Sequence, residues 1–505
     1  MTIKPKNILA FALLWLSGTT LAFDLPRTAP EAQGVPSAKV TALIDSLTSV
    51  PQAELHSLTL VRHGNVIAEV GVAPFSYDNQ HELFSVSKTF TGAAVGLAIA
   101  DNLLRLDDRL GAIIPEALPD SVPAEMADIT VRDLLTMTSG IPVDWMMRGR
   151  KDKWTPELLS HGMASAPGKN FAYDSMSSYL LSAIVQKVTG RTVLDYVTER
   201  IFTPLGITDF AWDLSPEGVT TGGWGLWMKP ESLARFGQML LDGGRWNGRQ
   251  ILPEQWVKLM TTKKIDVPGT SDYCYQMWTC DHPNTSRADG AWGQYIILMP
   301  DEDMVAVITQ CQQGVSEKMQ SYVWNVLSPA LSDKPLPVGK DYRKLQKRIS
   351  SVAHPFPAGK AGGHVLLPLL GKTLYLPENP MGWRELTLVK SGRDIKLIAQ
   401  TDKGITDTIV CGNKNWVKSV YTSNPPDERA DTHNRFSGHK NKWFADAAYG
   451  CTDAYPYGTF EAKIFFTNWY SSLDLKITPG ANDCDVTFHL NYSKPVTVKG
   501  VWKKP

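Results

Sequence analysis

One stretch decides the fold of this chain: Glu82-Leu83-Phe84-Ser85-Val86-Ser87-Lys88-Thr89-Phe90-Thr91-Gly92-Ala93. Residues three apart on a helix share one face, so a helix that begins at Ser85 brings its hydroxyl and the Lys88 ammonium to the same point. A lysine that loses its proton through burial can act as the base that a serine nucleophile needs. The helix N-terminus adds positive potential where an acyl oxyanion would form. The small, apolar run that follows predicts a helix packed on all sides.

A second Ser-x-x-Lys, at Ser437 and Lys440, is a control within the same chain. It lies among polar residues and no apolar run follows it, so we interpret it as a surface turn. At the first copy, the alternative to a nucleophile is an ordinary buried helix capped by Ser85 or Ser87. The motif alone does not decide between these readings.

Composition limits the possible functions. A chain of 505 residues with 43% apolar residues predicts two or three domains with a large core. The formal net charge is zero and no long basic block occurs, which argues against a nucleic-acid partner. The ten histidines are scattered, and neither His-Glu-x-x-His nor Cys-x-x-Cys occurs, so we expect no metal and no cofactor.

The N-terminus is typical of a secretory signal. Lys4 and Lys6 precede a short apolar core at 8–16, and Thr20-Leu21-Ala22 ends in a small residue. We predict a signal peptide over 1–22 and a secreted protein, periplasmic if the cell is Gram-negative. The core is too short to span a bilayer, so we expect no stable membrane insertion after cleavage. An uncleaved anchor is the alternative.

Six cysteines in an oxidising compartment permit disulfides. Cys274 with Cys280, and either Cys411 or Cys451 with Cys484, are plausible pairs. Cys311 completes the set, and buried free thiols remain the alternative for every one of them.

The order of elements predicts an α/β (α+β) domain over 23–335. Two short strands flank the turn His63-Gly64, apolar helical patterns follow, and two further strands come near the end of the region. This order favours an antiparallel sheet whose terminal strands meet, with a helical insertion. A linker rich in proline and glycine is predicted over 336–362, and alternating strands predict an all-β sandwich or barrel over 363–505.

The stretch Pro167-Gly168-Lys169-Asn170-Phe171-Ala172-Tyr173-Asp174-Ser175, followed by an apolar helix, resembles a family element. It is similar to the Tyr-x-Asn element of the class C β-lactamase, serine esterase and DD-peptidase family, the β-lactamase-related serine hydrolases. The resemblance covers about 28–330 and implies an antiparallel sheet flanked by helices, with a helical subdomain. The C-terminal region only weakly resembles the lipocalin-like β domains attached to some members.

The resemblance implies a role for each catalytic candidate. Ser85 would attack the acyl carbon, and Lys88 would draw or hold its proton. Tyr173, as a phenolate or by proton relay with Lys88, would pass a proton to the leaving group; a packing tyrosine is the alternative. The backbone N–H groups of Ser85 and Ala291 would form the oxyanion hole.

The third family element, a strand with Lys-Thr-Gly or His-x-Gly, matches 287–294 only in part. Gly290 is kept and would let substrate lie close to the strand, but Ala288 or Asp289 stands in place of the basic residue. Ser175 replaces the usual asparagine of the second element. Both departures weaken the case for β-lactam hydrolysis and leave acylation intact, and we do not expect Arg287 to compensate.

Trp224 and Trp227 fall where the family builds a cleft wall, and Trp145 and Trp154 lie in the region before Tyr173. They predict an apolar acyl or aromatic pocket, with ordinary aromatic packing as the alternative.

We therefore expect an exported serine hydrolase that forms an acyl-enzyme on Ser85 and hydrolyses small esters or amides. The first alternative is a penicillin-binding DD-peptidase or weak β-lactamase that acts on D-amino-acid peptides of the cell wall. The second is a binding module without turnover. An α/β-hydrolase is disfavoured because no Gly-x-Ser-x-Gly occurs. The C-terminal region could cover the active site, dimerise, bind wall polymer or only pack.

Overall fold

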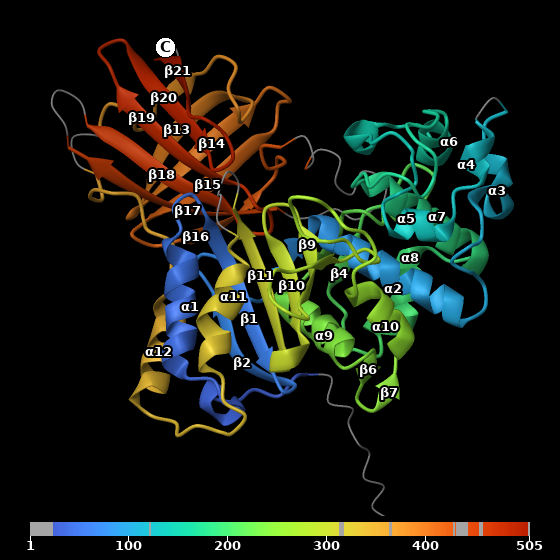
Figure 1. The fold of residues 1–505 in the computed structure, drawn as a ribbon. Coiled ribbons are helices and arrows are strands. Elements are labelled where there is room, and N and C mark those ends of the chain that lie inside the picture. The colour runs from blue at the N-terminus through green and yellow to red at the C-terminus, as the bar shows by residue number, and fades with distance from the viewer. Residues whose placement is uncertain are drawn as a thin grey trace, which may run out of the picture.

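The computed structural model describes residues 24–120, 123–312, 318–362, 366–427, 430, 443–453 and 458–502. Figure 1 shows a sheet with helices on both sides, a helical region beside it, and a separate β-barrel in orange and red. The predicted signal peptide and the second Ser-x-x-Lys lie outside the described residues. Among the described helices, none has the length and apolar character needed to cross a membrane.

A six-stranded antiparallel sheet is the centre of the first domain. Its strand order is β2 (Asn65–Gly71), β1 (Glu54–Arg62), β11 (Met304–Cys311), β10 (Gln294–Met299), β9 (Ser286–Gly290) and β8 (Trp278–Thr279). Leu58 of β1 pairs with Ile308 of β11, which confirms that strands from the two ends of the domain meet. His63 and Gly64 both have positive φ, as the tight turn between β1 and β2 requires.

The two faces of the sheet bury alternate side chains of each strand. On β10, Ile297 packs with α1 (Ser37–Ser49), α11 (Ser321–Leu327) and α12 (Lys340–Ser351) on one face. Ile296 packs with α9 (Pro230–Leu241) on the other (Figure 1). Because α12 contains the fully buried Leu345, this part of the segment predicted as linker is part of the packed domain.

The helical region holds α2, whose residues from Ser87 to Ala98 are all buried, as its apolar sequence predicts. Gly96 is required there, because a Cβ atom would lie 2.1 Å from the Trp256 ring. The α-helices of this part of the chain are α2 (Ser87–Ala100), α3 (Leu110–Ile113), α4 (Ala124–Ala127), α5 (Val131–Leu135), α6 (Trp154–Leu159), α7 (Ser175–Thr189), α8 (Val193–Val197) and α10 (Glu254–Thr261). The shorter helical turns of the whole first domain, those beside the central sheet included, are η1 (Pro30–Gln33), η2 (Phe84–Val86), η3 (Pro115–Ala117), η4 (Trp145–Gly149), η5 (Thr198–Phe202), η6 (Pro300–Glu302) and η7 (Ser328–Ala330). Two small sheets complete it: β3 (His81–Glu82) with β5 (Leu226–Met228) and β4 (Phe210–Trp212), and β6 (Arg245–Trp246) with β7 (Arg249–Gln250).

The C-terminal domain is a closed barrel of nine strands, so the all-β prediction is confirmed and its barrel form is the correct one. A parallel pairing of β15 with β17 closes the ring, and β16 pairs with β17 from outside it. Buried residues alternate with partly buried or exposed ones along β14, and with partly buried ones along β20, as the pleat of a strand with one inward face requires. The strands are β12 (Thr373–Tyr375), β13 (Trp383–Ser391), β14 (Asp394–Thr401), β15 (Thr406–Asn413), β16 (Val417–Tyr421), β17 (Trp443–Thr452), β18 (Thr459–Phe466), β19 (Ser472–Pro479), β20 (Asp483–Leu490) and β21 (Val496–Trp502).

All six cysteines are free thiols, so the two plausible disulfides do not form in this structure. The strand order of the barrel explains the absence of a second bridge. Cys411 lies on β15 and Cys451 on β17, and β17, β18 and β19 stand between β15 and the strand of their predicted partner, Cys484. Cys484 lies on β20, with two strands between it and β17. Burial raises the pKa of Cys274 to about 12, which keeps it a neutral thiol.

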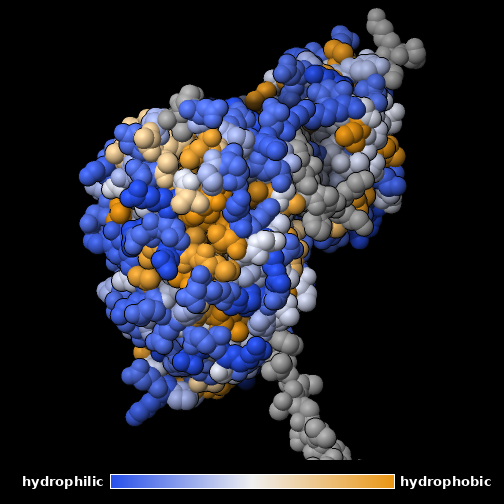
Figure 2. Space-filling view, turned by 90° about the vertical axis from the view of Figure 1, so that its right-hand side faces the viewer, coloured by the Kyte–Doolittle hydropathy of each residue, from blue (hydrophilic) through white to orange (hydrophobic). Residues whose placement is uncertain are grey.

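Figure 2 faces the helical side of the molecule and shows two lobes. Apolar side chains, in orange, gather in one patch on the larger lobe, whereas the smaller lobe is mostly hydrophilic on this face.

Candidate active site

The Ser85 segment joins the small sheet to the long buried helix. Ser85 lies in the single turn η2, and α2 begins two residues later at Ser87 rather than at Ser85. The turn and the helix are continuous, so Lys88 still lies one turn beyond the serine, and its Nζ donates to Ser85 Oγ at 2.8 Å. Ser87 is used differently: its Oγ accepts from the N–H of Leu226 and ties α2 to β5.

Lys88 is enclosed by neutral oxygens. Its ammonium donates to Ser85 Oγ, and also to Ser175 Oγ and the Gly223 carbonyl, both at 2.9 Å. Only 1% of Lys88 is exposed, and burial lowers its pKa to about 7, although the charges of Asp174 and Asp289 act to raise it. Lys88 therefore has a substantial unprotonated population at neutral pH, as a general base needs.

Tyr173 lies against both members of the pair. Its ring centroid is 4.9 Å from Lys88 Nζ, and it packs against the rings of Tyr273 and Trp278 at 5.9 and 5.4 Å. Burial raises the pKa of Tyr173 well above its usual range, against the opposing effect of a hydrogen bond with Ser85. The resting side chain is therefore a neutral phenol, which favours the relay form of its predicted role over the phenolate.

Asp174 sets the direction of Ser175. As the N-cap of α7, Asp174 accepts from the N–H groups of Met176 and Ser177 at 2.9 and 2.8 Å. This cap fixes the first turn of the helix, so Ser175, the next residue, directs its Oγ at Lys88. Where the family has an asparagine, this chain offers one hydroxyl oxygen to the lysine.

Strand β9 settles which residue stands in the basic position. Ala288 is buried in the core, whereas Asp289 faces a cavity that also reaches Ser85. Asp289 accepts from Arg287 Nε at 2.7 Å; burial raises the pKa of the Asp289 carboxyl and the Arg287 charge opposes this.

Gly290 lets two backbone segments meet. A Cβ atom at this position would lie 2.3 Å from the carbonyl oxygen of Leu83. The space kept free by the glycine is therefore taken by the Ser85 segment, and not by substrate as the sequence predicts. This close approach places Ala291 beside Ser85, and both residues line the same two cavities.

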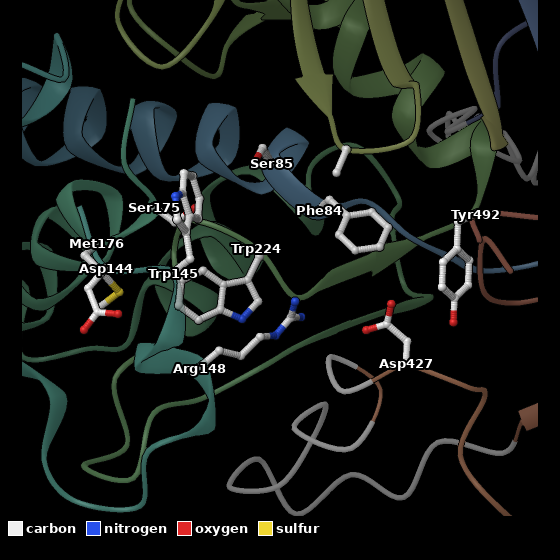
Figure 3. A pocket seen from close by; sticks show the side chains of 11 residues that line it. Phe84, Ser85, Asp144, Trp145, Arg148, Ser175, Met176, Trp224, Asp427 and Tyr492 are labelled. Carbon is white, nitrogen blue, oxygen red and sulfur yellow. The ribbon is translucent and has the colours of Figure 1, made fainter. Parts of the chain in front are cut away.

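Two cavities meet at Ser85, Trp145 and Ala291. The smaller, about 340 Å³, contains Tyr173, Trp278 and Asp289. The larger, about 620 Å³, is drawn in Figure 3, and its walls come from both domains. Its lining residues are Phe84, Ser85, Asp144, Trp145, Arg148, Ser175, Met176, Trp224, Ala291, Asp427 and Tyr492.

The two tryptophans predicted to form a cleft wall lie in different places. Trp224 lines the larger cavity, with the Arg148 guanidinium 5.5 Å from its ring centroid. Trp227 does not line it. Its indole is 1% exposed and stacks on Trp469 of the barrel at 5.8 Å. Trp154 is buried in the core, whereas Trp145 is 60% exposed at the mouth of both cavities.

Arg148, Asp427 and Tyr492 are among the cavity residues that the sequence analysis missed. Arg148 had a usable signal, since it follows Trp145 in the loop before Tyr173. Asp427 and Tyr492 come from the barrel, and no sequence signal could have connected them with the active site. In Figure 3 they lie across the cavity from Trp224 and Arg148. Within the described ranges, no three His, Cys, Asp or Glu side chains gather where they could hold a metal ion.

Comparisons with known proteins identify the family of this chain. The family model described as Beta-lactamase matches residues 52–324. The 6-aminohexanoate-dimer hydrolase of Paenarthrobacter ureafaciens is 26% identical over 335 residues, which cover 60% of this chain and 85% of that protein. Among solved structures, EstCE1, a hydrolase with promiscuous acyltransferase activity, is 18% identical, with a TM-score of 0.49 over 57% of this chain and 98% of its own. The octameric penicillin-binding protein homologue from Pyrococcus abyssi is 16% identical, with a TM-score of 0.46 over 91% of this chain and 98% of its own. Because the family model spans more than half of the chain, from the first strand of the central sheet to α11, this protein belongs to the β-lactamase family of serine hydrolases.

Proposed function

We propose that this protein hydrolyses esters or amides through an acyl-enzyme on Ser85. The observation that carries the proposal is the buried contact of 2.8 Å between Lys88 Nζ and Ser85 Oγ, at a lysine whose pKa is lowered to about 7. A base with this pKa takes up the serine proton at neutral pH without an external cofactor. The relative named as a hydrolase of the 6-aminohexanoate dimer supports this choice of chemistry.

Acylation follows from the placement of the groups. Neutral Lys88 takes the Ser85 hydroxyl proton as Oγ forms its bond to the acyl carbon. The resulting oxyanion lies between the N–H groups of Ser85 and Ala291, which stabilise it by hydrogen bonding. As the tetrahedral species collapses, the Tyr173 phenol gives its proton to the leaving oxygen or nitrogen and recovers one from the Lys88 ammonium. Water then attacks the acyl carbon, loses its proton to Lys88, and displaces Ser85, which regains its hydroxyl proton.

The negative charge of Asp289 beside the site favours substrates that have no carboxylate next to the scissile bond. Asp289 faces the cavity where the basic residue of penicillin-recognising relatives would stand, and it repels an anion there. Arg287 does not replace that cation, because its guanidinium is directed to Asp289, to Ser271 Oγ and to the Thr279 carbonyl.

A second candidate function is DD-peptidase or weak β-lactamase activity on cell-wall peptides. Arg148 favours it, because its guanidinium lines the larger cavity and could bind a substrate carboxylate. Its Nε and Nη2 atoms are buried, and Nη2 lies 3.7 and 3.9 Å from the carboxylates of Glu82 and Asp213, which already offset part of its charge. The signal peptide predicted from the sequence supports this candidate, since it would direct export to the compartment where such peptides occur.

One pair of serine variants tests the proposal. Wild type, Ser85→Ala and the matched Ser437→Ala, which removes the second Ser-x-x-Lys serine, are assayed on a panel of p-nitrophenyl esters and anilides. We expect turnover by wild type and Ser437→Ala and none by a folded Ser85→Ala. Retained turnover in Ser85→Ala would overturn the mechanism.

Intact mass after incubation with benzylpenicillin separates the two candidate functions. An adduct that depends on Ser85 would favour cell-wall peptides. Its absence, with ester turnover intact, would favour the ester or amide hydrolase.

A further inference from the structure

Two bulky residues beside the oxyanion hole have strained backbones. Phe84, just before Ser85, has φ of 48°, and Trp292, just after Ala291, has φ of 67°. The left-handed region is unfavourable for large side chains, and such residues keep it only where their surroundings hold them. Each of the two N–H groups that would bind the oxyanion is therefore next to a residue that needs support.

One side chain of the barrel contacts both strained residues. The Tyr470 ring lies 4.5 Å from the Trp292 ring and stacks on it at 11°, and it meets the Phe84 ring at 5.6 Å and 67°. Tyr470 is 1% exposed, and its hydroxyl donates to the carboxylate of Asp427, which lines the larger cavity. Trp469 adds a second ring contact to Phe84, at 5.6 Å. Among the described residues, its ring makes no such contact with Trp292.

The turn that contains Tyr470 is held against the six-stranded sheet of the first domain by hydrogen bonds. Tyr470 lies between β18 and β19, and its carbonyl accepts from Asn491 Nδ2 at 3.1 Å. The same amide donates to Glu54, the first residue of β1, at 2.7 Å. Glu54 also accepts from Lys463 at 2.8 Å and from Ser472 at 2.8 and 2.9 Å. The turn is thus held from both domains, as a rigid support requires.

We propose that Tyr470 is a positioning residue that holds both halves of the oxyanion hole at their working separation. The inference rests on the proposed function, because it assigns Tyr470 a part in the acylation of Ser85. It gives the barrel a role inside the active site: a residue of one domain sets the geometry of two backbone N–H groups in the other. Ordinary packing between the domains is the competing account, and the two accounts predict different kinetics.

Three variants distinguish the accounts. Tyr470→Ala removes the ring, and Tyr470→Phe keeps the ring but loses the hydrogen bond to Asp427. The matched control is Phe465→Ala, which removes a barrel ring that is 1% exposed and packs on Phe75 and His354, away from the oxyanion hole. If Tyr470→Ala does not fold, Tyr470→Leu, which keeps apolar volume without stacking, takes its place.

We expect the ring variant to lower kcat with little effect on KM. Loss of one oxyanion donor costs about 10²–10³ in kcat, so a displaced hole should cost Tyr470→Ala about 10- to 100-fold. KM should stay within about threefold, since the interaction acts in the transition state. Inhibition by an arylboronic acid, whose tetrahedral adduct places an oxygen in the hole, should weaken in step with kcat. Tyr470→Phe should keep kcat close to that of wild type, and Phe465→Ala should lose thermal stability without a comparable loss of kcat.

Two results would overturn the proposal in an active enzyme. One is a loss of kcat in Tyr470→Ala no greater than in Phe465→Ala. The other is an equal loss in Tyr470→Phe and Tyr470→Ala, which would assign the effect to the hydroxyl. Failure of the proposed function is distinguishable, because wild type itself would then turn over no ester and bind no boronate, and both proposals would fall.

Discussion

Two lysines, one in each half of the molecule, have pKa values shifted in opposite directions. Lys88, in the active site, contacts three neutral oxygens, and burial lowers its pKa to about 7. Lys463, where the barrel meets β1, keeps 14% of its side chain exposed, and the carboxylates of Glu54 and Asp474 outweigh the effect of burial and raise its pKa. The comparison shows that the partners of a buried lysine decide whether it becomes a base or an anchor.

The largest expected effect comes from exchanging each lysine for arginine, which keeps the charge and cannot act as a base. Lys88→Arg should lower kcat by about 10²–10⁴, the usual contribution of general base catalysis. Lys463→Arg should leave kcat near the wild-type value, since its role needs only a cation. Steady-state kinetics on the best ester would measure kcat of both variants. Equal rates in the two variants would contradict the different roles assigned to Lys88 and Lys463.

The next effect concerns stability. Glu54→Gln leaves Lys463 with a weaker partner and should lower the free energy of unfolding by about 1–3 kcal/mol, the usual cost of losing a hydrogen bond to a charged group, since both side chains are partly exposed, at 13% and 14%. Urea unfolding at neutral pH measures it, and Glu378→Gln, at an exposed carboxylate of the barrel, is the control.

The pair of Glu54 and Lys463 also predicts that the folded protein loses stability at acid pH. Burial acts to raise the pKa of Glu54, but Lys463 and the other partners outweigh it, so the folded-state pKa lies below the usual 4.5. A depressed carboxyl pKa contributes stability above the unfolded-state value that is lost as the pH falls through the folded-state value. Wild type should therefore lose this stabilisation below about pH 4.5, and Glu54→Gln should show a flatter profile there. Parallel profiles would argue that Glu54 and Lys463 do not act as an ion pair.

The smallest expected effect sharpens the account of Lys88. Asp289→Asn removes a negative charge that raises the Lys88 pKa, and it frees the positive charge of Arg287. Both changes lower the lysine pKa, so the rising limb of kcat/KM against pH should move to lower pH. Asp474→Asn, beside Lys463, should leave the limb in place. A shift toward higher pH in Asp289→Asn would contradict the assignment of Lys88 as the base.

The parts of the site that sequence analysis predicted are those fixed by local geometry. The spacing of Ser85 and Lys88 survives although α2 begins at Ser87, because a helical turn of either kind brings residues three apart together. The meeting of β1 with β11 likewise follows from strands at both ends of the domain.

What could not be predicted depends on contacts between distant segments. Trp224 and Trp227 are three residues apart, but Gly225 between them has φ of 81°, and the two indoles reach different surroundings. Tyr470, Asp427 and Tyr492 lie in three different loops of the barrel, and they reach the active site only because this end of the barrel docks beside Phe84 and Trp292. No periodic pattern in the sequence of these segments predicts that they contact one another.

The shared wall of the larger cavity has a consequence for how this protein can diverge. The residues that we propose make and break bonds, Ser85, Lys88 and Tyr173, belong to one domain, whereas Asp427 and Tyr492, which line a cavity with Ser85, belong to the other. Inherited changes in the barrel loops can therefore alter which molecules are accepted while the reaction itself is preserved. Selection on substrate range and selection on reactivity can act on separate parts of one gene.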